Sequence, residues 1–394
     1  MSSRVIGKTE YRKMLIFNKI SITATVMAIA MGVAVALSTP AMAEWAVADG
    51  RSPAEAAEQT LSGRGAAEIV VAADGSGDYK TLQEAINATP DYSHGKWTTI
   101  RVRSGSYREE VIIPSCKRCL KITGDDAGST VITFGKYARQ MWPGRDFEVG
   151  TSGSATVFVL ADDVILENLT IENSAGGGKG IDQAVALLTD GDRVLLRKCR
   201  LLGNQDTIYT YGKYADDGGI KRNCFIDCYI EGTTDFIFGP SIAWFQDCTI
   251  HSKKDSYITA ASTLRGERFG YVFKDCKLTA AKGVGKCWLG RPWGAYAKTV
   301  FINCELGAHI LPEGWHDWER PGKPDSKANS FYAEYGSTGP GAVGGTASPR
   351  VEWSHSLSAE ETALYTPANV FSRKGLADRD GKASPAASDW NPFE

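Results

Sequence analysis

The stretch that decides the fold is Cys224-Phe-Ile-Asp-Cys228-Tyr-Ile230, because close copies of it return along the chain. Each copy has the order apolar, apolar, variable, polar, cysteine, variable, apolar. The other copies, and one earlier relative without cysteine, are Leu195–Leu201, Trp244–Ile250, Val272–Leu278, Val300–Leu306 and Val164–Ile171. The cysteines stand 20 to 29 residues apart, and repeats of that size are typical of stacked structural units.

The segments between the copies indicate what each unit contains. From residue 98 to about residue 310 the chain consists of short β-branched strands separated by Gly, Asn and Asp, with no segment long enough for a crossover helix. This pattern predicts an all-β fold, a parallel β-helix whose strands stack coil upon coil. After Gly314 we expect aromatic loops around Trp315, Trp318, Tyr332 and Tyr335.

Two capping boxes predict short helices at the ends of the β-helix. Thr81-Leu-Gln-Glu84 begins a helix that Pro90 limits, and Ser358-Ala-Glu-Glu361 begins another that runs to about Phe371. The end coils of a stacked fold expose their core, so helices are expected there as covers.

The repeated cysteines allow two interpretations. Equivalent positions on successive coils lie about 4.8 Å apart, which is within the Cα separation that a disulfide needs. Cys228 and Cys248 are the closest pair in the series and the best candidates for a disulfide. The alternative is a ladder of small buried thiols, a role that cysteine fills well.

The two ends of the chain differ from its middle. Residues 1–43 contain a basic start, an apolar run from Ile20 to Leu37 and an Ala-x-Ala site at Ala41–Ala43, which predicts a secretory signal peptide. The apolar run is also about long enough for a transmembrane anchor, and the cleavage site favours the signal peptide. We expect a flexible leader at 44–67, the β-helix domain at 68–371 and a polar, poorly ordered tail at 372–394.

Composition and missing motifs exclude several classes of function. The formal net charge is −2, so no basic excess indicates a nucleic-acid partner. The chain has no Gly-x-Ser-x-Gly elbow, no His-Glu-x-x-His and no phosphate loop. Cys116-x-x-Cys119 has no matching second pair, which favours a disulfide or a plain structural role over zinc.

Two aspartates on neighbouring repeats are the remaining candidates for chemistry. Asp206, in Asn204-Gln-Asp-Thr207, and Asp235, in Thr234-Asp-Phe236, stand seven residues after Cys199 and Cys228. We therefore expect both carboxylates at the same position of adjacent coils, where like charges push their pKa values apart and leave one carboxyl protonated. The alternative is that they only cap turns, although the apolar strands around them are an unusual place for that.

Other residue types near these aspartates suit ester hydrolysis. Gln183, one coil earlier, carries an amide that can donate to an oxyanion. Arg291 could keep Asp235 ionised, and Trp293 could stack on a sugar ring. Their alternatives are a surface ion pair for Arg291 and a core position for Trp293.

Taken together, these segments resemble the pectin methylesterase (pectinesterase) family, from about Val70 to Phe371. The most specific motif is Ile230-Glu-Gly-Thr-Thr-Asp-Phe-Ile-Phe-Gly239, and three others occur in the family's order. These three are Gln183-Ala-Val-Ala-Leu187, Gly203-Asn-Gln-Asp-Thr207 and Leu289-Gly-Arg-Pro-Trp293. The resemblance implies a right-handed parallel β-helix that hydrolyses methyl esters of polygalacturonate without metal or cofactor.

The resemblance also implies residue roles. Asp235 would be the nucleophile and Asp206 the general acid and then base, while Gln183 and Gln205 would stabilise the oxyanion and Arg291 would orient Asp235. The substrate contacts would come from Tyr209, Phe238, Trp293 and Thr156. Cys228 and Cys248 fall where bacterial members can carry a disulfide.

Two departures from the family pattern matter. Tyr214–Lys221 is an insertion between the aspartates that could alter subsite selectivity, and 44–67 is too short for the inhibitory pro-domain of many plant members. With the signal peptide, this predicts a secreted bacterial enzyme, extracellular or periplasmic, that is a monomer, binds methylated pectin and leaves the membrane after cleavage.

Three rival functions share this fold. They are an esterase or thioesterase for another acyl substrate, a polysaccharide lyase or galacturonase, and a non-catalytic carbohydrate-binding β-helix. A lyase generally needs calcium and a basic residue at the scissile position, and a binding module should have lost Asp206 or Asp235.

Overall fold

The structure, a computed structural model, describes residues 68–394 apart from 217, 320–324, 343–349, 374–388 and 394. The signal peptide expected at 1–43 and the leader expected at 44–67 lie outside the described residues. The β-helix begins at Glu68, where the sequence predicted the first structured segment.

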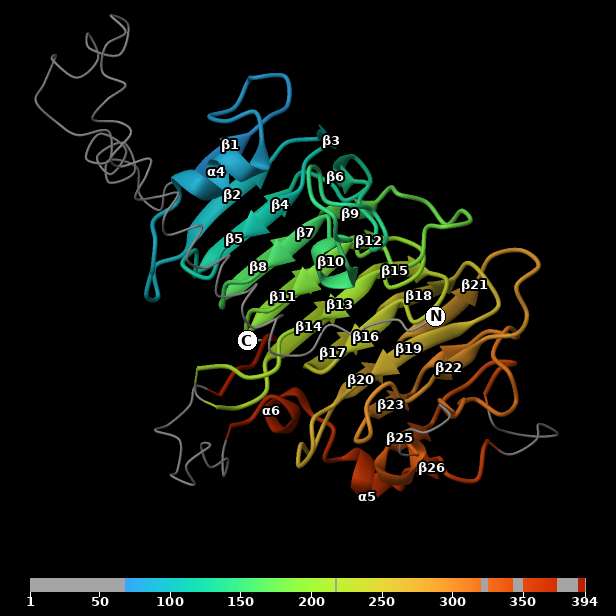
Figure 1. The fold of residues 1–394 in the computed structure, drawn as a ribbon. Helices are drawn as coiled ribbons and strands as arrows, with labels where there is room; N and C mark the ends of the chain where they lie inside the picture. The colour runs from blue at the N-terminus through green and yellow to red at the C-terminus, as the bar shows by residue number, and fades with distance from the viewer. Residues whose placement is uncertain (1–67, 217, 320–324, 343–349, 374–388, 394) are drawn as a thin grey trace, which may run out of the picture. The chain divides into compact units, whose positions relative to one another are not determined.

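Three parallel sheets run along the stack of coils, as Figure 1 shows. In the described residues the first sheet has eleven strands, in the order β1 (Glu68–Val71), β2 (Thr98–Val102), β5 (Leu120–Gly124), β8 (Val164–Glu167), β11 (Val194–Arg197), β14 (Arg222–Ile226), β17 (Ile242–Gln246), β20 (Tyr271–Lys274), β23 (Lys298–Ile302), β25 (Phe331–Tyr335) and β26 (His355–Ser356). The second sheet has eight, β3 (Gly105–Tyr107), β6 (Thr130–Phe134), β9 (Thr170–Asn173), β12 (Arg200–Leu202), β15 (Tyr229–Gly232), β18 (Thr249–Ser252), β21 (Lys277–Ala280) and β24 (Glu305–Leu306).

The third sheet carries the candidate site. Its strands are β4 (Val111–Ile113), β7 (Val157–Val159), β10 (Leu187–Thr189), β13 (Ile208–Thr210), β16 (Ile237–Gly239), β19 (Tyr257–Ala261) and β22 (Trp288–Gly290). The chain passes from the first sheet to the second, then to the third, and then rises to the next coil. The fold is therefore the right-handed parallel β-helix that the repeats and the resemblance predicted.

The repeated phrase forms the corner between the first and second sheets. Its polar residue adopts a left-handed backbone conformation, with φ of 52° at Asp227 and 54° at Asp247. Asp and Asn tolerate that conformation better than most residues, which explains why this position is usually one of them. Lys198 occupies the same corner with φ of 50° and is the exception.

Equivalent side chains stack inside the coils. Four phenylalanine rings form a column with centroid separations of 4.4 to 4.6 Å and interplanar angles of 5 to 7°. The members of this column are Phe225, Phe245, Phe273 and Phe301. Such offset stacking adds to the burial of large apolar area that holds the coils together.

The cysteines form the thiol ladder and not the predicted disulfide. All nine are free, and the repeat cysteines are buried. The thiol of Cys228 donates to the carbonyls of Ile226 and Leu196 at 3.4 and 3.7 Å, and Cys248 bonds to its own coil and the preceding one in the same way. Parallel in-register stacking points equivalent side chains in one direction, so the expected Cys228–Cys248 bond is corrected to two separate thiols.

Short helices are present as predicted, but the helix at Pro367–Val370 packs on the outer face of the first sheet and not on an end coil. Helix α4 (Leu82–Ala88) has the predicted capping box at Thr81 and buries Leu82, Ala85 and Ile86. The helix expected from 358 to about 371 is instead two turns, α5 (Ala359–Thr362) and α6 (Pro367–Val370). The residue before a proline avoids the helical region, and Thr366, which is extended, separates the two. The short 3-10 turns η1 (Thr151–Gly153) and η2 (Lys327–Asn329) lie in loops.

The end of the chain is less simple than the expected polar tail. Residues 374–388 lie outside the described residues, but Trp390 packs on Phe371 with ring centroids 4.8 Å apart. Arg197 donates to the carbonyl of Pro392 at 2.6 Å. The described residues of the tail therefore pack on the first sheet. Tyr332 and Tyr335, expected in loops, lie in β25, which adds a further strand to that sheet.

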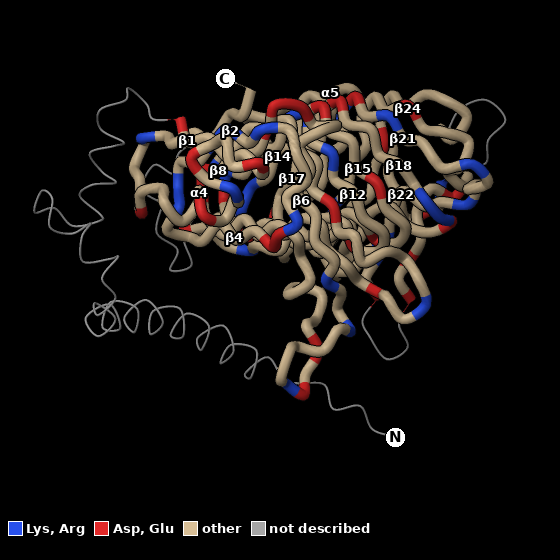
Figure 2. The backbone as a smooth tube through the Cα atoms, turned by 90° about the horizontal axis from the view of Figure 1, so that it is seen from above, with Lys and Arg blue, Asp and Glu red and all other residues tan. Residues whose placement is uncertain are grey.

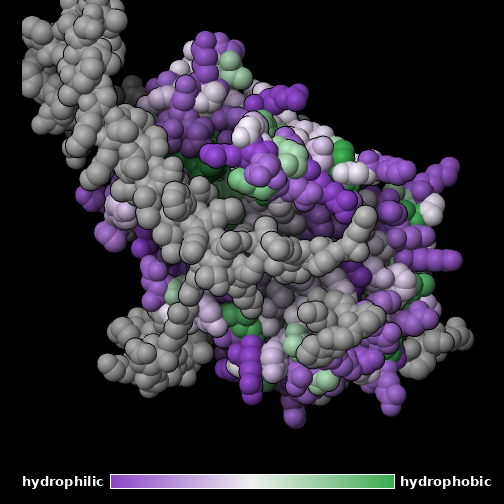
Figure 3. Space-filling view, viewed as in Figure 1, coloured by the Kyte–Doolittle hydropathy of each residue, from purple (hydrophilic) through white to green (hydrophobic). Residues whose placement is uncertain are grey.

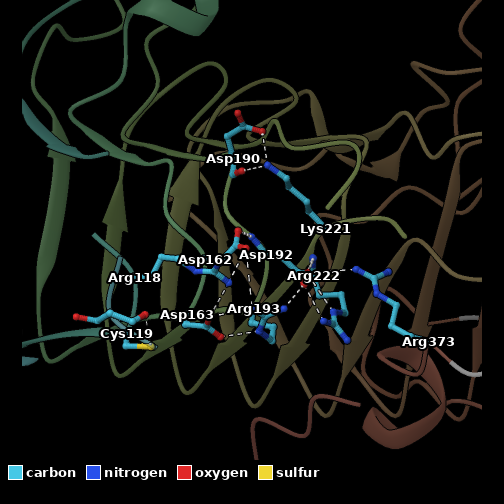
Figure 4. Close-up of polar contacts among 11 residues, drawn as sticks. Arg118, Cys119, Asp162, Asp163, Asp190, Asp192, Arg193, Lys221, Arg222 and Arg373 are labelled. Carbon is cyan, nitrogen blue, oxygen red and sulfur yellow. Dashed lines mark hydrogen bonds and ion pairs between the residues drawn. The ribbon is translucent and has the colours of Figure 1, made fainter. Parts of the chain in front are cut away.

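A buried ionic network lies at the corners that lead from the third sheet back to the first (Figure 4). Asp192 is fully buried and accepts hydrogen bonds from Arg222 at 2.7 and 3.0 Å and from Arg193 at 2.7 Å. Burial raises its pKa, but the bonds from Arg222 and the charges of the surrounding arginines bring the pKa below its usual value. Removing the arginines would leave the Asp192 carboxylate buried without a partner, which would strongly destabilise the fold.

Surface charge and hydropathy are mixed. Figure 2 shows basic and acidic positions interspersed along the described coils, and the face in Figure 3 is mostly hydrophilic with scattered apolar side chains. In the described part of the chain, no helix is long and apolar enough to cross a membrane.

Candidate active site

The two aspartates occupy equivalent positions on adjacent coils. Strands β13 and β16 pair with Ile208 opposite Ile237, and each aspartate lies two residues before its strand. The backbone amide of Asp206 donates to the Thr234 carbonyl at 3.0 Å, and that of Asp235 donates to the Tyr257 carbonyl on the next coil at 2.8 Å. Both residues have positive φ, 66° and 49°, so each turns a corner into the third sheet. The structure thus brings the two together as their spacing predicted.

Only one of the two carboxyls is held by a cation. Arg291 follows β22 and donates through Nε to Asp235 Oδ1 at 3.0 Å and through Nη2 to Oδ2 at 2.6 Å. The fork of the guanidinium matches both carboxylate oxygens, an arrangement that is stronger and more directional than a single bond. Among the described residues, no side chain donates a hydrogen bond to the carboxyl of Asp206.

Burial and charge separate the proton affinities of the pair. Asp206 is 8% exposed and Asp235 is 6% exposed. Burial, followed by the charge of Asp235, raises the pKa of Asp206 well above its usual value. Burial also raises the pKa of Asp235, but the hydrogen bonds and the charge of Arg291 oppose that rise. Asp206 is therefore the group that keeps its proton, and Asp235 is the better candidate for the ionised form.

Two aromatic residues that sequence reasoning did not assign to the site contact Arg291. The guanidinium carbon lies 3.8 Å from the ring centroid of Tyr257 and 3.8 Å from that of Trp318. Tyr257 occupies the position on the next coil that is equivalent to Asp235, so the same comparison of successive coils could have found it. Trp318 lies in a loop outside the repeat, and no periodic signal in the sequence indicates its position.

The two glutamines lie beside the aspartates. Gln205 immediately precedes Asp206, and its carbonyl accepts the amide of Ala184 at 3.1 Å, which places Gln183 on the neighbouring coil. Both side chains are half-buried. In the part of the chain that the structure describes, neither side-chain amide is hydrogen-bonded, so both can donate to a ligand.

The predicted aromatic contacts form a group on the outer face of the third sheet. Tyr209 stacks on Phe238 with centroids 4.1 Å apart at 22°, and Trp293 lies edge-on to both at 6.3 and 5.9 Å. Phe238, the register partner of Tyr209 on the next coil, is only 4% exposed, so Tyr209 and Trp293 offer more ring surface to a ligand than Phe238 does. Half-buried aromatic rings next to polar groups are suited to the apolar faces of sugar rings.

Thr156 does not fit the role that the resemblance implied. It is fully buried, and its hydroxyl donates to the carbonyls of Glu172 at 2.9 Å and Phe134 at 3.3 Å. The side chain therefore faces the interior of the β-helix, where a substrate cannot reach it. We correct its expected substrate contact to an internal structural one.

Two further features bear on alternative functions. Within the described ranges, no group of three or more His, Cys, Asp or Glu side chains could hold a metal ion. In the insertion 214–221, of which residue 217 lies outside the described residues, Tyr214 and Ile220 form an antiparallel bridge and Lys221 makes an ion pair with Asp190 at 3.1 Å. Its influence on selectivity stays a prediction.

Comparisons with known proteins agree on one family. A family model described as Pectinesterase matches residues 68–374. Pectinesterase 31 of Arabidopsis thaliana is 38% identical over 301 residues, which cover 75% of this chain and 90% of the relative. Among solved structures, pectin methylesterase from carrot superposes with a TM-score of 0.67 at 33% identity, covering 77% of this chain and 92% of that one. A pectin methylesterase in complex with a hexasaccharide has a TM-score of 0.64 at 28% identity, with 77% and 96% covered.

Proposed function

The chain belongs to the pectinesterase family, and from that premise we propose how its own residues carry out the family's reaction. The protein is a carboxylic ester hydrolase that acts on pectin. It converts methyl-esterified galacturonate residues and water to free carboxylates, methanol and protons.

One observation carries the assignment of roles: two buried carboxyls stand on adjacent coils, and Arg291 holds only one of them. The ionised carboxylate of Asp235 is then available as a nucleophile, while the protonated carboxyl of Asp206 is available as an acid. Covalent catalysis by a carboxylate divides ester hydrolysis into two easier steps.

In the first step, an Asp235 oxygen attacks the ester carbonyl carbon. As the tetrahedral intermediate collapses, the bond to the methoxy oxygen breaks and Asp206 gives its proton to that oxygen, which releases methanol. The product is an anhydride between Asp235 and the galacturonyl group. Gln183 and Gln205 are suited to stabilise the oxyanion of this step, because amide donors fixed near a developing negative charge lower the barrier.

In the second step, Asp206 acts as a base. Its carboxylate takes a proton from a water molecule, and the water oxygen attacks the galacturonyl carbonyl. The bond to Asp235 breaks, which restores the Asp235 carboxylate and leaves the proton on Asp206. Atoms balance over the two steps, and we propose that neither needs a metal or a cofactor.

The aromatic group is the proposed platform for the polymer. Tyr209 and Trp293 lie next to the corner that carries the aspartates and offer half-buried rings to a sugar. The hexasaccharide complex of a related pectin methylesterase supports an extended oligosaccharide as the ligand of this fold.

The cellular location and the oligomeric state of the protein are proposed from the N-terminal segment and from the composition of the active site. We propose that residues 1–43 direct secretion, and the basic start and Ala-x-Ala site support a bacterial secreted type. Pectinesterase 31 and the carrot enzyme are from plants, so the bacterial assignment rests on the N-terminal pattern. A monomer is the proposed state, because Asp206, Asp235 and Arg291 all come from one chain.

The experiment that tests the proposal measures methanol release from highly methylated pectin in the presence of a chelator, beside an assay for chain cleavage. Methanol without new reducing ends or unsaturated products is the expected result. New chain ends would indicate a lyase or a galacturonase. A folded sample that releases no methanol at any pH would favour an esterase for another acyl substrate.

A further inference from the structure

The guanidinium of Arg291 lies against two aromatic rings. Tyr257 and Trp318 each lie with their ring centroid 3.8 Å from the guanidinium carbon, while the edge of the group donates to both oxygens of Asp235. The three partners of Arg291 come from separate parts of the chain: Tyr257 from β19, Trp318 from the loop that follows Trp315, and Asp235 from the corner before β16. We propose that Tyr257 and Trp318 form an aromatic clamp that positions Arg291, and through it the nucleophile Asp235. The inference rests on the proposed role of Asp235.

Physical chemistry favours this arrangement over a free arginine. A cation over an aromatic face is attracted by the ring's electron density, and the attraction strengthens when water is excluded. The Arg291 side chain is 18% exposed, so much of its hydration is already lost. An arginine held between its carboxylate and two aromatic rings loses the rotamer freedom that would let it leave the carboxylate, and its planar fork then stays aligned with both oxygens.

The clamp is itself supported on one side. Tyr257 stacks on Trp288 at 5.0 Å and 25°, and His316 lies edge-on to both rings at 5.1 and 5.2 Å. These contacts with Trp288 and His316 restrict the movement of the Tyr257 ring. Trp318 is half-buried and also packs against the apolar group that contains Tyr209 and Trp293.

The ionisable groups that face the Asp235 carboxyl show why its position matters. Asp206 faces this carboxyl from the preceding coil, and Arg291 faces it from the segment after β22. Tyr257 lies on the next coil. The negative charge of Asp235 also contributes to the raised pKa of the buried Tyr332 phenol on β25. Arg291 is the one cation in that set. Any loosening of Arg291 leaves a buried carboxylate facing a second carboxyl, which favours the protonated and inactive form of Asp235.

Four substitutions and one control test the clamp. Trp318→Leu and Tyr257→Leu remove the aromatic face, and Trp318→Phe and Tyr257→Phe keep it. We expect the leucine variants to lower kcat about tenfold, from the loss of one partly desolvated cation–π contact, and the phenylalanine variants to stay within about twofold. The acidic limb of the kcat–pH profile should move upward by about half to one pH unit in the leucine variants only. Trp97→Leu, at a 45% exposed tryptophan before β2, is the matched control and should change neither quantity.

Two outcomes would overturn the proposal. One is a raised KM with kcat and the acidic limb unchanged, which would make Trp318 a sugar platform only. The other is loss of kcat in the phenylalanine variants equal to that in the leucine variants. A carbon-13 NMR titration of the Asp235 carboxyl needs no substrate, so it tests the clamp even if wild-type protein releases no methanol. The leucine variants should raise the titration midpoint, and an unchanged midpoint would refute the clamp.

Discussion

Replacing Arg291 with glutamine removes the one cation that is bonded to Asp235 among the residues the structure describes, while keeping a hydrogen-bond donor at that place. The wild-type pair has two bonds, at 3.0 and 2.6 Å, between side chains that are 18% and 9% exposed. Breaking a buried ion pair by removing one partner costs about 3–5 kcal/mol. The pair is partly exposed and the glutamine amide can still donate a hydrogen bond, so we expect a cost at the lower end of that range, about 3 kcal/mol. At about 1.4 kcal/mol per unit, the pKa of Asp235 should rise by about two units.

The sign of the effect on activity follows from the form of Asp235 that reacts. The nucleophile must be ionised, so a raised pKa moves the acidic limb of the pH profile to higher pH by about two units. At a fixed pH on that limb, methanol release should fall about a hundredfold. The assay is the initial rate of methanol release from methylated pectin between pH 4 and pH 9 (roughly the range in which buried carboxyls titrate).

A matched variant separates this effect from general loss of charge. Arg101→Gln breaks an ion pair to Asp125 at 2.8 Å on the exposed first coils, where the arginine is 52% exposed, and should leave the profile unchanged. If Arg291→Gln keeps the wild-type acidic limb and loses less than about threefold in rate, Arg291 does not tune Asp235 and the reasoning above is wrong.

Three further predictions concern single features. Asp206→Asn should lower methanol release at least about a hundredfold, because the general acid is lost. Because the pKa of Asp206 is higher in the folded protein than in the unfolded chain, the wild-type protein loses stability as the pH rises from the unfolded pKa through the folded pKa. The free energy of urea unfolding of Asp206→Asn should therefore depend less on pH than that of wild type. An unchanged pH dependence would argue against a raised pKa at Asp206. Thr156→Val should cost about 1 kcal/mol of unfolding free energy without changing KM for pectin, whereas a raised KM would return Thr156 to the substrate site. Protein denatured without reductant should yield all nine thiols in a colorimetric titration, and a count of seven would show one disulfide and contradict the ladder of free thiols.

The repeats made much of the fold predictable from the sequence. One phrase returning every 20 to 29 residues indicates both the coil and its stacking direction, because each copy must pair with the next. The same reasoning placed Asp206 beside Asp235, since each stands at one distance from its repeat cysteine. Where the repeat ends, the prediction weakens: Tyr332 was expected in a loop and lies in β25.

The remaining differences have local physical causes. Coil superposition gives the distance between Cys228 and Cys248 but not the direction of their side chains, and the parallel ladder points both thiols at carbonyls. Thr156 and the site aspartates are all near strands of the third sheet, yet only the structure shows that Thr156 points inward. Trp318 reaches Arg291 from a loop without repeat signals, so no periodicity could have assigned it.

The most direct test of the central claim is the methanol-release rate of Asp235→Asn against wild type, with folding verified by circular dichroism and chelator present throughout. If Asp235 is the nucleophile, the variant should lose at least about a thousandfold in kcat while still binding pectin. A variant that turns over methylated pectin at close to the wild-type rate would contradict the assignment of Asp235 and the two-step mechanism built on it.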